Sequence, residues 1–259
     1  MAEMKKFKDL PYQRVVYEEV EKEYRALMDE FKAAKSGEEQ FEVHKKYYAL
    51  SNRTTTMMTI AQIRFDINTE DEFYGKEKEY YDEMEPKLAN LIVEYKRAVY
   101  DSPYREYLEG KIGKVAFKSM ELELKSFDEK LIPLMQEENA LITRYDKIIA
   151  GAKIEWEGET LNLSLLRPYM TSNDRSVRKK AYGKYSAFFL SHAEELDEIY
   201  DGLVKNRTEQ ARQMGYENYI ELGYYRMNRN CYDKDMVENY RNQVKQYFVP
   251  FAEKLHERR

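Results

Sequence analysis

The sequence has few of the residues from which disulfide frameworks, metal sites and phosphate-binding loops are built. Its 259 residues include one cysteine, three histidines and ten glycines. The single Cys231 excludes a disulfide within the chain, which agrees with a reducing compartment, and we interpret it as a small, partly buried side chain. Because the glycines stand singly and no Gly-x-Ser-x-Gly, Cys-x-x-Cys or Gly-rich loop occurs, the sequence excludes the usual phosphate cradles and common nucleophile motifs.

Long apolar runs are also missing. No stretch approaches the roughly 18 apolar residues that a membrane-spanning helix needs. The first six residues, Met-Ala-Glu-Met-Lys-Lys, contain no apolar signal core. We therefore expect a cytoplasmic protein with no membrane partner.

The sequence has no excess of positive charge. Lys and Arg number 43 against 48 Asp and Glu, for a net charge of −5, and the two signs are interspersed. Nucleic acid is therefore not expected as a partner, because its binders need a basic face to neutralise phosphates. Hydrophobic residues make up 42%, a proportion too high for an intrinsically disordered chain, so we expect a folded protein.

Apolar side chains recur at spacings of three and four along most of the chain, the pattern of amphipathic helices. The first predicted helix covers residues 12–35, and Gly37 suits its C-terminal cap. Pro86 and Pro250 are expected to kink or interrupt the helices that contain them. The same periodicity predicts further helices over residues 38–68, 71–100, 131–149, 172–214, 216–227 and 233–259.

Residues 152–163 change this rhythm. Ile154 and Trp156 alternate with charged residues, and Glu157-Gly158 supplies a turn. The pattern is typical of a β-hairpin. The sequence therefore predicts an all-α fold of long antiparallel helices with one small β-hairpin near 152–163. We expect an N-terminal helical region over 1–150, followed by the hairpin and long helices over 151–259.

The histidines form no catalytic or metal-binding constellation. His44 has no second ligand at helical spacing, and Phe189 stands where a Glu-x-x-His pair would need a glutamate before His192. A hydrogen bond between His192 and Glu195 is conceivable. We predict that this chain contributes no catalytic residue and no metal ligand, and that it holds no cofactor of its own.

Tyrosine is abundant, with 24 residues. For most of them we favour packing within amphipathic helices, with the hydroxyl at the water boundary. The alternative is a groove whose rings pack on a peptide. Residues 219–227 gather aromatic rings and an arginine around a short helix, so any peptide-binding side chains are expected there. The candidate substrate-binding residues are Tyr219, Tyr224, Tyr225 and Arg226.

Three segments, in this order, resemble the N-terminal half of oligoendopeptidase F-type enzymes, which belong to the M3 family of zinc metallopeptidases. They are Ile154–Leu163, Asp174–Ala181 and Gly215–Met227. The resemblance implies a helical protein of two lobes around a deep channel that admits short peptides. In that family zinc is held by the two histidines of His-Glu-x-x-His and by a later glutamate. The resemblance places all of those positions beyond Arg259.

The leading hypothesis is that the chain is the N-terminal, channel-forming portion of a zinc-dependent oligopeptidase that hydrolyses short peptides. The periodic pattern still runs at Arg259, which suggests continuation into a C-terminal catalytic half. The chain alone is then predicted to be inactive. Zinc is implied for the complete enzyme, and the expected partners are short peptides and the C-terminal half. The alternative is a non-catalytic helical scaffold or peptide-binding module.

Overall fold

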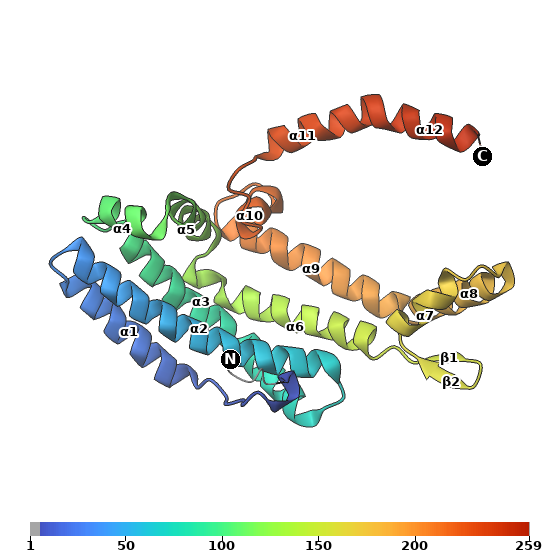
Figure 1. Cartoon of the computed structure of the whole chain (residues 1–259), viewed down its shortest axis with the longest axis horizontal. Coiled ribbons are helices and arrows are strands. Elements are labelled where there is room, and N and C mark those ends of the chain that lie inside the picture. Colours follow the sequence, from blue (N-terminus) through green and yellow to red (C-terminus); the bar gives the residue numbers. More distant parts are fainter. Residues whose placement is uncertain (1–5, 259) are drawn as a thin grey trace.

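The computed structural model describes residues 6–258, so residues 1–5 and Arg259, at the end of the last predicted helix, lie outside the described residues. The fold is helical, as the sequence predicts (Figure 1). Within the described part, the strands of one two-stranded antiparallel hairpin are the only β-structure. None of the helices in residues 6–258 combines the length and apolar character that a bilayer crossing requires.

Three long helices form a bundle in the N-terminal part of the chain (Figure 1). They are α1 (Tyr17–Ala33), α2 (Gly37–Ile67) and α3 (Glu72–Tyr100). Short connections between them make neighbouring helices antiparallel. Two shorter helices, α4 (Arg105–Ile112) and α5 (Lys114–Ser126), pack on α2 and α3 at one end of the bundle.

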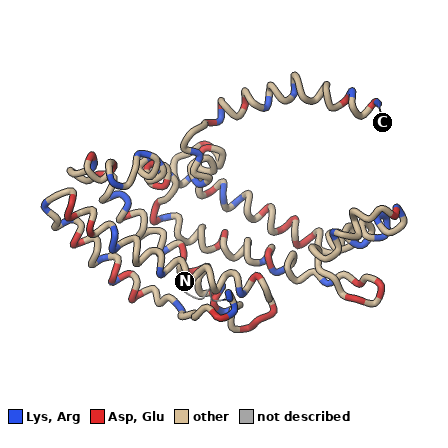
Figure 2. The backbone as a smooth tube through the Cα atoms, in the orientation of Figure 1, with Lys and Arg blue, Asp and Glu red and all other residues tan. Residues whose placement is uncertain are grey.

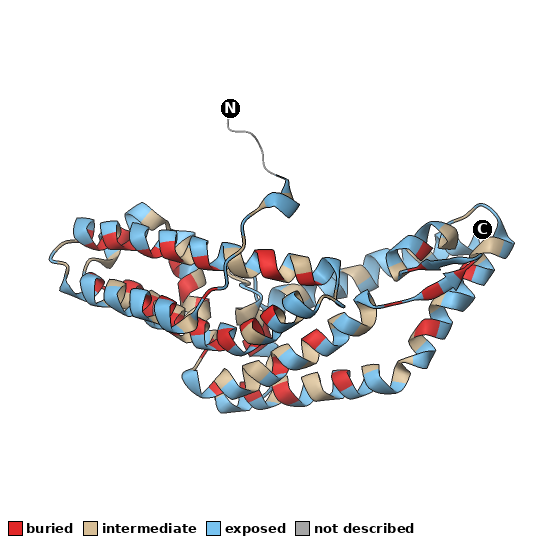
Figure 3. Cartoon of the chain, turned by 90° about the horizontal axis from the view of Figure 1, so that it is seen from below, coloured by how far each residue is buried: buried red, intermediate tan, exposed pale blue. Residues whose placement is uncertain are grey.

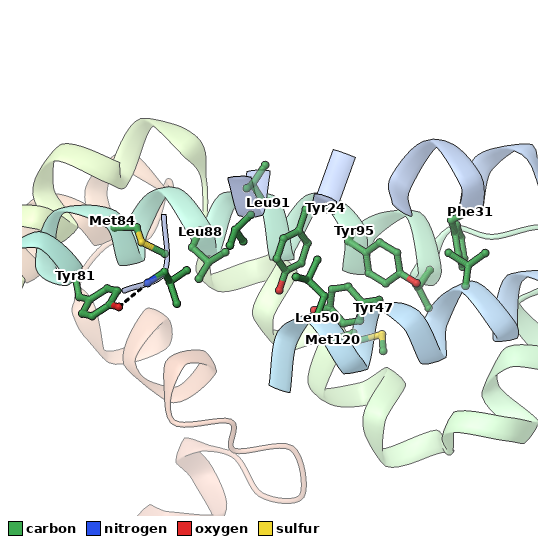
Figure 4. Packing of buried hydrophobic residues seen from close by; sticks show 14 of the residues in the cluster. Tyr24, Phe31, Tyr47, Leu50, Tyr81, Met84, Leu88, Leu91, Tyr95 and Met120 are labelled. Atoms are coloured by element: carbon green, nitrogen blue, oxygen red, sulfur yellow. Dashed lines mark hydrogen bonds between the residues drawn. The ribbon is translucent and has the colours of Figure 1, made fainter. Parts of the chain in front are cut away.

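The core of this bundle is rich in aromatic side chains. Tyr47 and Tyr95 stack face to face with ring centroids 4.0 Å apart and planes 7° apart, and Phe31 meets Tyr95 edge-on. Figure 4 shows these rings following one another along the interior of the bundle. Buried positions lie where the helices face one another (Figure 3). The tyrosines of the bundle core therefore serve packing, as predicted for most of the tyrosines.

A long helix leads from the bundle to a second packed unit. After the turn η2 (Glu129–Leu131), α6 (Ile132–Ala150) begins with Pro133 in its first turn, a position that tolerates proline. The hairpin strands β1 (Ile154–Trp156) and β2 (Glu159–Leu161) follow. Two helices then pack together beside the hairpin, α7 (Leu163–Met170) and α8 (Arg175–Ser191).

The hairpin forms where the sequence places it. Trp156 pairs with Glu159 across a two-residue turn, and Glu157 (φ 52°) and Gly158 (φ 92°) both take the left-handed conformation that a type I′ turn requires. Trp156 is buried with Leu166 of α7 in a second apolar cluster. Helix α8, which covers this cluster, carries Lys and Arg but no Asp or Glu (Figure 2).

The chain then returns along α6 and finally leaves the body, the name used below for the elements from α1 to α10. Helix α9 (Ala193–Gln213) packs against α6, and α10 (Tyr219–Arg226) packs against α5 and α9. The last elements are α11 (Lys234–Gln243), the π-helical turn η3 (Val244–Phe248) and α12 (Val249–Glu257). We refer to residues 234–257 as the arm. The arm arches over α9, away from the body (Figure 1).

The helix predicted over residues 172–214 is wrong in one respect, because the structure has two helices, α8 and α9, that break at His192. Two side chains contact the Phe188 carbonyl oxygen in the last turn of α8. Ser191 donates a hydrogen bond from Oγ to Phe188 O at 2.8 Å, and His192 Nδ1 lies 2.9 Å from the same oxygen. Such local side-chain bonds favour a helix end even where the apolar periodicity continues.

The first helix begins at Tyr17 rather than at residue 12. Residues 10–16 instead run as an extended strap against α3, where Tyr81 Oη accepts a hydrogen bond from Val15 N at 2.9 Å. Arg14 and Tyr12 also bond the buried carboxylate of Glu77. These partners lie more than sixty residues further along the chain. The local periodicity favours a helix here, but the contacts with α3 hold the segment extended instead.

Gly37 does not cap α1, because Ala34 ends that helix and Gly37 is the first residue of α2. Ser36 caps α2 by accepting a hydrogen bond from Glu39 N at 3.2 Å. A Cβ at Gly37 would lie 2.8 Å from the Tyr107 side chain, which explains the glycine. Pro86 lies inside the uninterrupted α3, so it does not divide that helix.

Candidate functional site

The predicted peptide-binding segment forms the short helix α10 and the turn that follows it. Gly215, with φ 86°, closes α9, and Asn218 caps α10 by accepting a hydrogen bond from Ile220 N at 2.9 Å. Leu222 and Gly223 are buried on the face toward α5 and α9. The sequence therefore fixes which face of α10 is inward.

Arg226 lies in a partly buried network of polar side chains that joins α10 to α6 and α9. Its guanidinium donates to Glu138 Oε2 at 3.2 Å and also bonds Gln210. Glu138 further accepts from Arg207 Nε at 2.6 Å and from Gln210 Nε2 at 2.8 Å. Burial by itself raises the pKa of Glu138, but the hydrogen bonds from Arg207 and Gln210 and the charge of Arg226 outweigh it, so the pKa is lowered.

Tyr219 lies on the same side of α10 as this network. The guanidinium carbons of Arg207 and Arg226 are each 5.9 Å from the centroid of its ring. A Cβ at Gly223 would come within 3.2 Å of the Tyr219 ring, so the ring packs closely over that glycine. Two of the four candidate residues, Tyr219 and Arg226, thus lie among side chains that hold α10 in place.

Tyr224 and Tyr225 instead line a surface cleft of about 410 Å³ between α10 and the start of the arm. The Tyr225 hydroxyl donates to Glu221 Oε1 at 2.7 Å, and this bond, with burial, raises the pKa of Tyr225 to about 12. The Arg229 guanidinium lies 4.1 Å above the Tyr224 ring. The full lining is Glu217, Asn218, Ile220, Glu221, Tyr224, Tyr225, Arg229, Tyr232, Asp233 and Lys234.

Six aromatic or charged lining residues were not among the candidates from the sequence: Glu217, Glu221, Arg229, Tyr232, Asp233 and Lys234. The spacing of Tyr224, Arg229 and Tyr232 in one short segment is the signal that could have identified Arg229 and Tyr232 among them. The cleft offers phenol faces for stacking and both signs of charge for backbone and side-chain contacts. Such a surface suits an extended peptide.

The described residues do not fit a zinc site. Within residues 6–258, no group of three or more His, Cys, Asp and Glu side chains is placed to hold a metal ion. His44 is buried beside the rings of Tyr47 and Tyr95, where burial and then the charge of Lys96 lower its pKa to about 4. Glu195 forms an ion pair with Arg144 at 3.6 Å, while His192 lies against Phe188 O.

Cys231 is exposed, so its expected partial burial is wrong. It lies in the segment between α10 and α11, where the chain crosses from the body to the arm without forming a core. With no packed surroundings, a small apolar side chain gains no burial there.

Comparison with known proteins gives a consistent set of similarities. The sequence model described as the Peptidase M3 N-terminal domain matches residues 7–127. The structure of PZ peptidase A with an inhibitor is 42% identical, with a TM-score of 0.94, over 98% of this chain and 45% of that one. A structure described as oligoendopeptidase F is 41% identical, with a TM-score of 0.93, over 98% of this chain and 45% of that one.

An oligoendopeptidase F structure from Bacillus anthracis str. Ames is also similar, with 39% identity and a TM-score of 0.93. That match covers 97% of this chain and 46% of the other. The chain therefore spans less than half the length of the solved structures that it matches. A search of curated protein sequences gave no match.

Proposed function

Because the chain belongs to the M3 peptidase family and corresponds to its N-terminal part, we propose that it is the channel-forming portion of a zinc-dependent oligopeptidase. The observation that carries the proposal is its similarity, at 42% identity over 98% of its length, to less than half of a peptidase. The substrates of the complete enzyme are short peptides. The regions 1–150 and 151–259 are part of the same proposal, supported by two separate apolar clusters.

The zinc of this proposal belongs to polypeptide outside this chain. In the family, His-Glu-x-x-His and a later glutamate supply the ligands, and zinc activates the attacking water when bound. This chain shapes the wall against which a peptide lies. By itself it does not hydrolyse peptides.

The arm supports a partner of this kind, because its large apolar side chains have no cover. A helix without tertiary packing is marginally stable, and contiguous exposed apolar residues mark interaction surfaces. We assign this surface to the C-terminal half of the complete enzyme. The exposed apolar residues of the arm are Met236, Tyr240, Tyr247, Phe248, Val249, Phe251 and Leu255.

For the four candidate residues we propose two roles. Tyr224 and Tyr225 line the cleft and contact the peptide. Tyr219 and Arg226 do not contact the peptide but hold α10 in the position that forms the cleft. Support for this division comes from the bonds of Arg226 to Glu138 and from the open position of the two other rings.

We also place the protein in the cytoplasm as part of the proposal. Its one cysteine, Cys231, is exposed as a free thiol. Free exposed thiols persist in reducing compartments, which supports this location.

The test is hydrolysis of internally quenched short peptides. The chain alone is expected to be inactive, and the chain together with the polypeptide encoded after codon 259 is expected to cleave, to lose activity with a chelator and to regain it with Zn²⁺. A reading frame that contains no His-Glu-x-x-His after codon 259 would contradict the proposal. Peptide binding without cleavage by the assembled protein would favour the alternative, a peptide-binding scaffold.

A further inference from the structure

The direction of the arm is set by a short linker, residues 227–233. Within the described residues, α11, η3 and α12 follow one another as one continuous helical stretch, and no element of the body makes substantial contact with them. None of the arm residues in α11, η3 or α12 is buried. A helix that is joined to the body at one end needs a fixed connection if it is to point in one direction.

Arg229 bridges the two ends of this linker. Its guanidinium carbon lies 4.1 Å from the ring centroid of Tyr224, on α10, and 5.5 Å from that of Tyr232, just before the arm. One planar cation thus contacts an aromatic ring of the body and an aromatic ring at the root of the arm. Arg229 is half-buried, which strengthens such contacts by removing part of the competing water.

Backbone and side-chain hydrogen bonds fix the parts of the linker on both sides of Arg229. Asn228, at φ 51°, ends α10 in the left-handed conformation, and Arg229 N donates to Tyr224 O at 3.2 Å. Asn230 Nδ2 donates to Ser119 Oγ on α5 at 3.2 Å. Asp233 caps α11 by accepting from Met236 N at 2.9 Å. Between Asn230 and Asp233, the contact of Tyr232 with the Arg229 guanidinium connects the linker to the body.

We infer that Arg229 is a positioning residue that fixes the direction of the arm by contacting Tyr224 of the body and Tyr232 beside the arm at the same time. Arginine suits this role because its flat guanidinium stacks on two rings, whereas the compact ammonium of lysine does not. We call the contacts of Arg229 with Tyr224 and Tyr232 the latch. Its functional meaning rests on the proposed function, since the arm is then the surface that receives the catalytic half. The latch itself is a property of the described chain.

The test measures the distance distribution between nitroxide labels on the body and on the arm. In the full chain, Cys231→Ser removes the native thiol, and Asp197→Cys on α9 and Lys254→Cys on α12 supply two exposed labelling sites. The parent protein is expected to show one narrow distribution. Arg229→Ala is expected to widen it at least about twofold, and Arg229→Lys to restore only part of the order.

Two further variants test whether the order of the arm depends on Tyr232 and not on arginines in general. Tyr232→Leu is expected to widen the distribution as Arg229→Ala does, whereas Arg241→Ala, which removes an exposed arginine of the arm itself, should leave it unchanged. Circular dichroism checks that helicity is retained. A distribution that is already broad in the parent, or one that Arg229→Ala leaves narrow, overturns the latch. Failure of peptide hydrolysis would overturn the proposed function and leave the distance result standing.

Discussion

Arg226 of α10 donates a hydrogen bond to Glu138 of α6, with 3.2 Å between the two atoms, although the two residues are 88 positions apart in the sequence. Glu138 is at the same time bonded to Arg207 of α9, so one carboxylate joins three helices. Helix α10, which carries Tyr224 and Tyr225, is attached to α6 and α9 through this group.

Replacing Glu138 should loosen that attachment. Glu138→Ala leaves two arginines without their shared carboxylate, and we expect the free energy of unfolding to fall by about 2 kcal/mol or more. Urea unfolding measures the change. As a control, Glu157→Gln removes an exposed ion pair with Lys180 and is expected to cost at most about 0.5 kcal/mol. Equal losses in the two variants would contradict the role assigned to Glu138.

His44 makes stability depend on pH. Its pKa in the folded chain is about 4, below its ordinary value of 6.5, so the unfolded chain binds more protons between these two values. The free energy of unfolding therefore falls as the pH decreases through this window, with about 2 kcal/mol of the His44 contribution lost between pH 7 and pH 5. His44→Phe keeps a flat ring beside Tyr47 and Tyr95 and should remove this part of the dependence. Parallel pH profiles for parent and variant would show that His44 is not its source.

Replacement by alanine is expected to change stability in opposite directions at Gly37 and Gly75. At Gly37 a Cβ would lie 2.8 Å from the Tyr107 side chain, so Gly37→Ala is expected to destabilise by about 1–3 kcal/mol through overpacking. At Gly75, in the first turns of α3, nothing lies within 4 Å, and Gly75→Ala is expected to stabilise by about 0.5–1 kcal/mol. Thermal unfolding of the pair tests the prediction, which fails if both variants shift in the same direction.

The cleft residues should affect peptide turnover without affecting the fold. In the complete enzyme, Tyr225→Ala is expected to raise KM several-fold and to leave helicity unchanged, because the ring lies on the surface of α10. Arg226→Ala is expected to lower turnover together with stability, because it opens the Glu138 network. Tyr182→Ala, on the exposed side of α8, serves as the control. Unaltered kinetics in Tyr225→Ala would remove the cleft from the substrate path.

The sequence predicts what depends on neighbours along the chain. The alternation at Ile154 and Trp156 and the turn at Glu157-Gly158 identify the hairpin, and the three-four spacing identifies the helices. It fails where a distant or competing contact decides. The strap of residues 10–16 is extended because Tyr81 takes its backbone hydrogen bond, and α8 ends because Ser191 and His192 reach for Phe188 O.

The same distinction applies to the candidate site. The sequence gathers Tyr219, Tyr224, Tyr225 and Arg226 within one short helix, and the structure agrees that they lie on α10. The direction of Arg226 depends on Glu138 and Gln210, whose positions no local pattern contains. The cluster of aromatic residues and an arginine singles out the segment in the sequence, and only the tertiary structure separates the cleft residues from those that hold the helix.

The π-helical turn η3 has a geometric consequence for whatever binds the arm. Val249 N donates to Val244 O, five residues back, just before Pro250, which has no N–H to offer. One added residue in a turn rotates everything after it by about 100° relative to an uninterrupted α-helix. In an uninterrupted α-helix, Phe251 and Leu255 would lie about 60° around the axis from Met236 and Tyr240. The extra residue turns Phe251 and Leu255 back by about 100°, so that all four side chains lie within about 80° around the axis, and a binding surface can lie along one side of the arm.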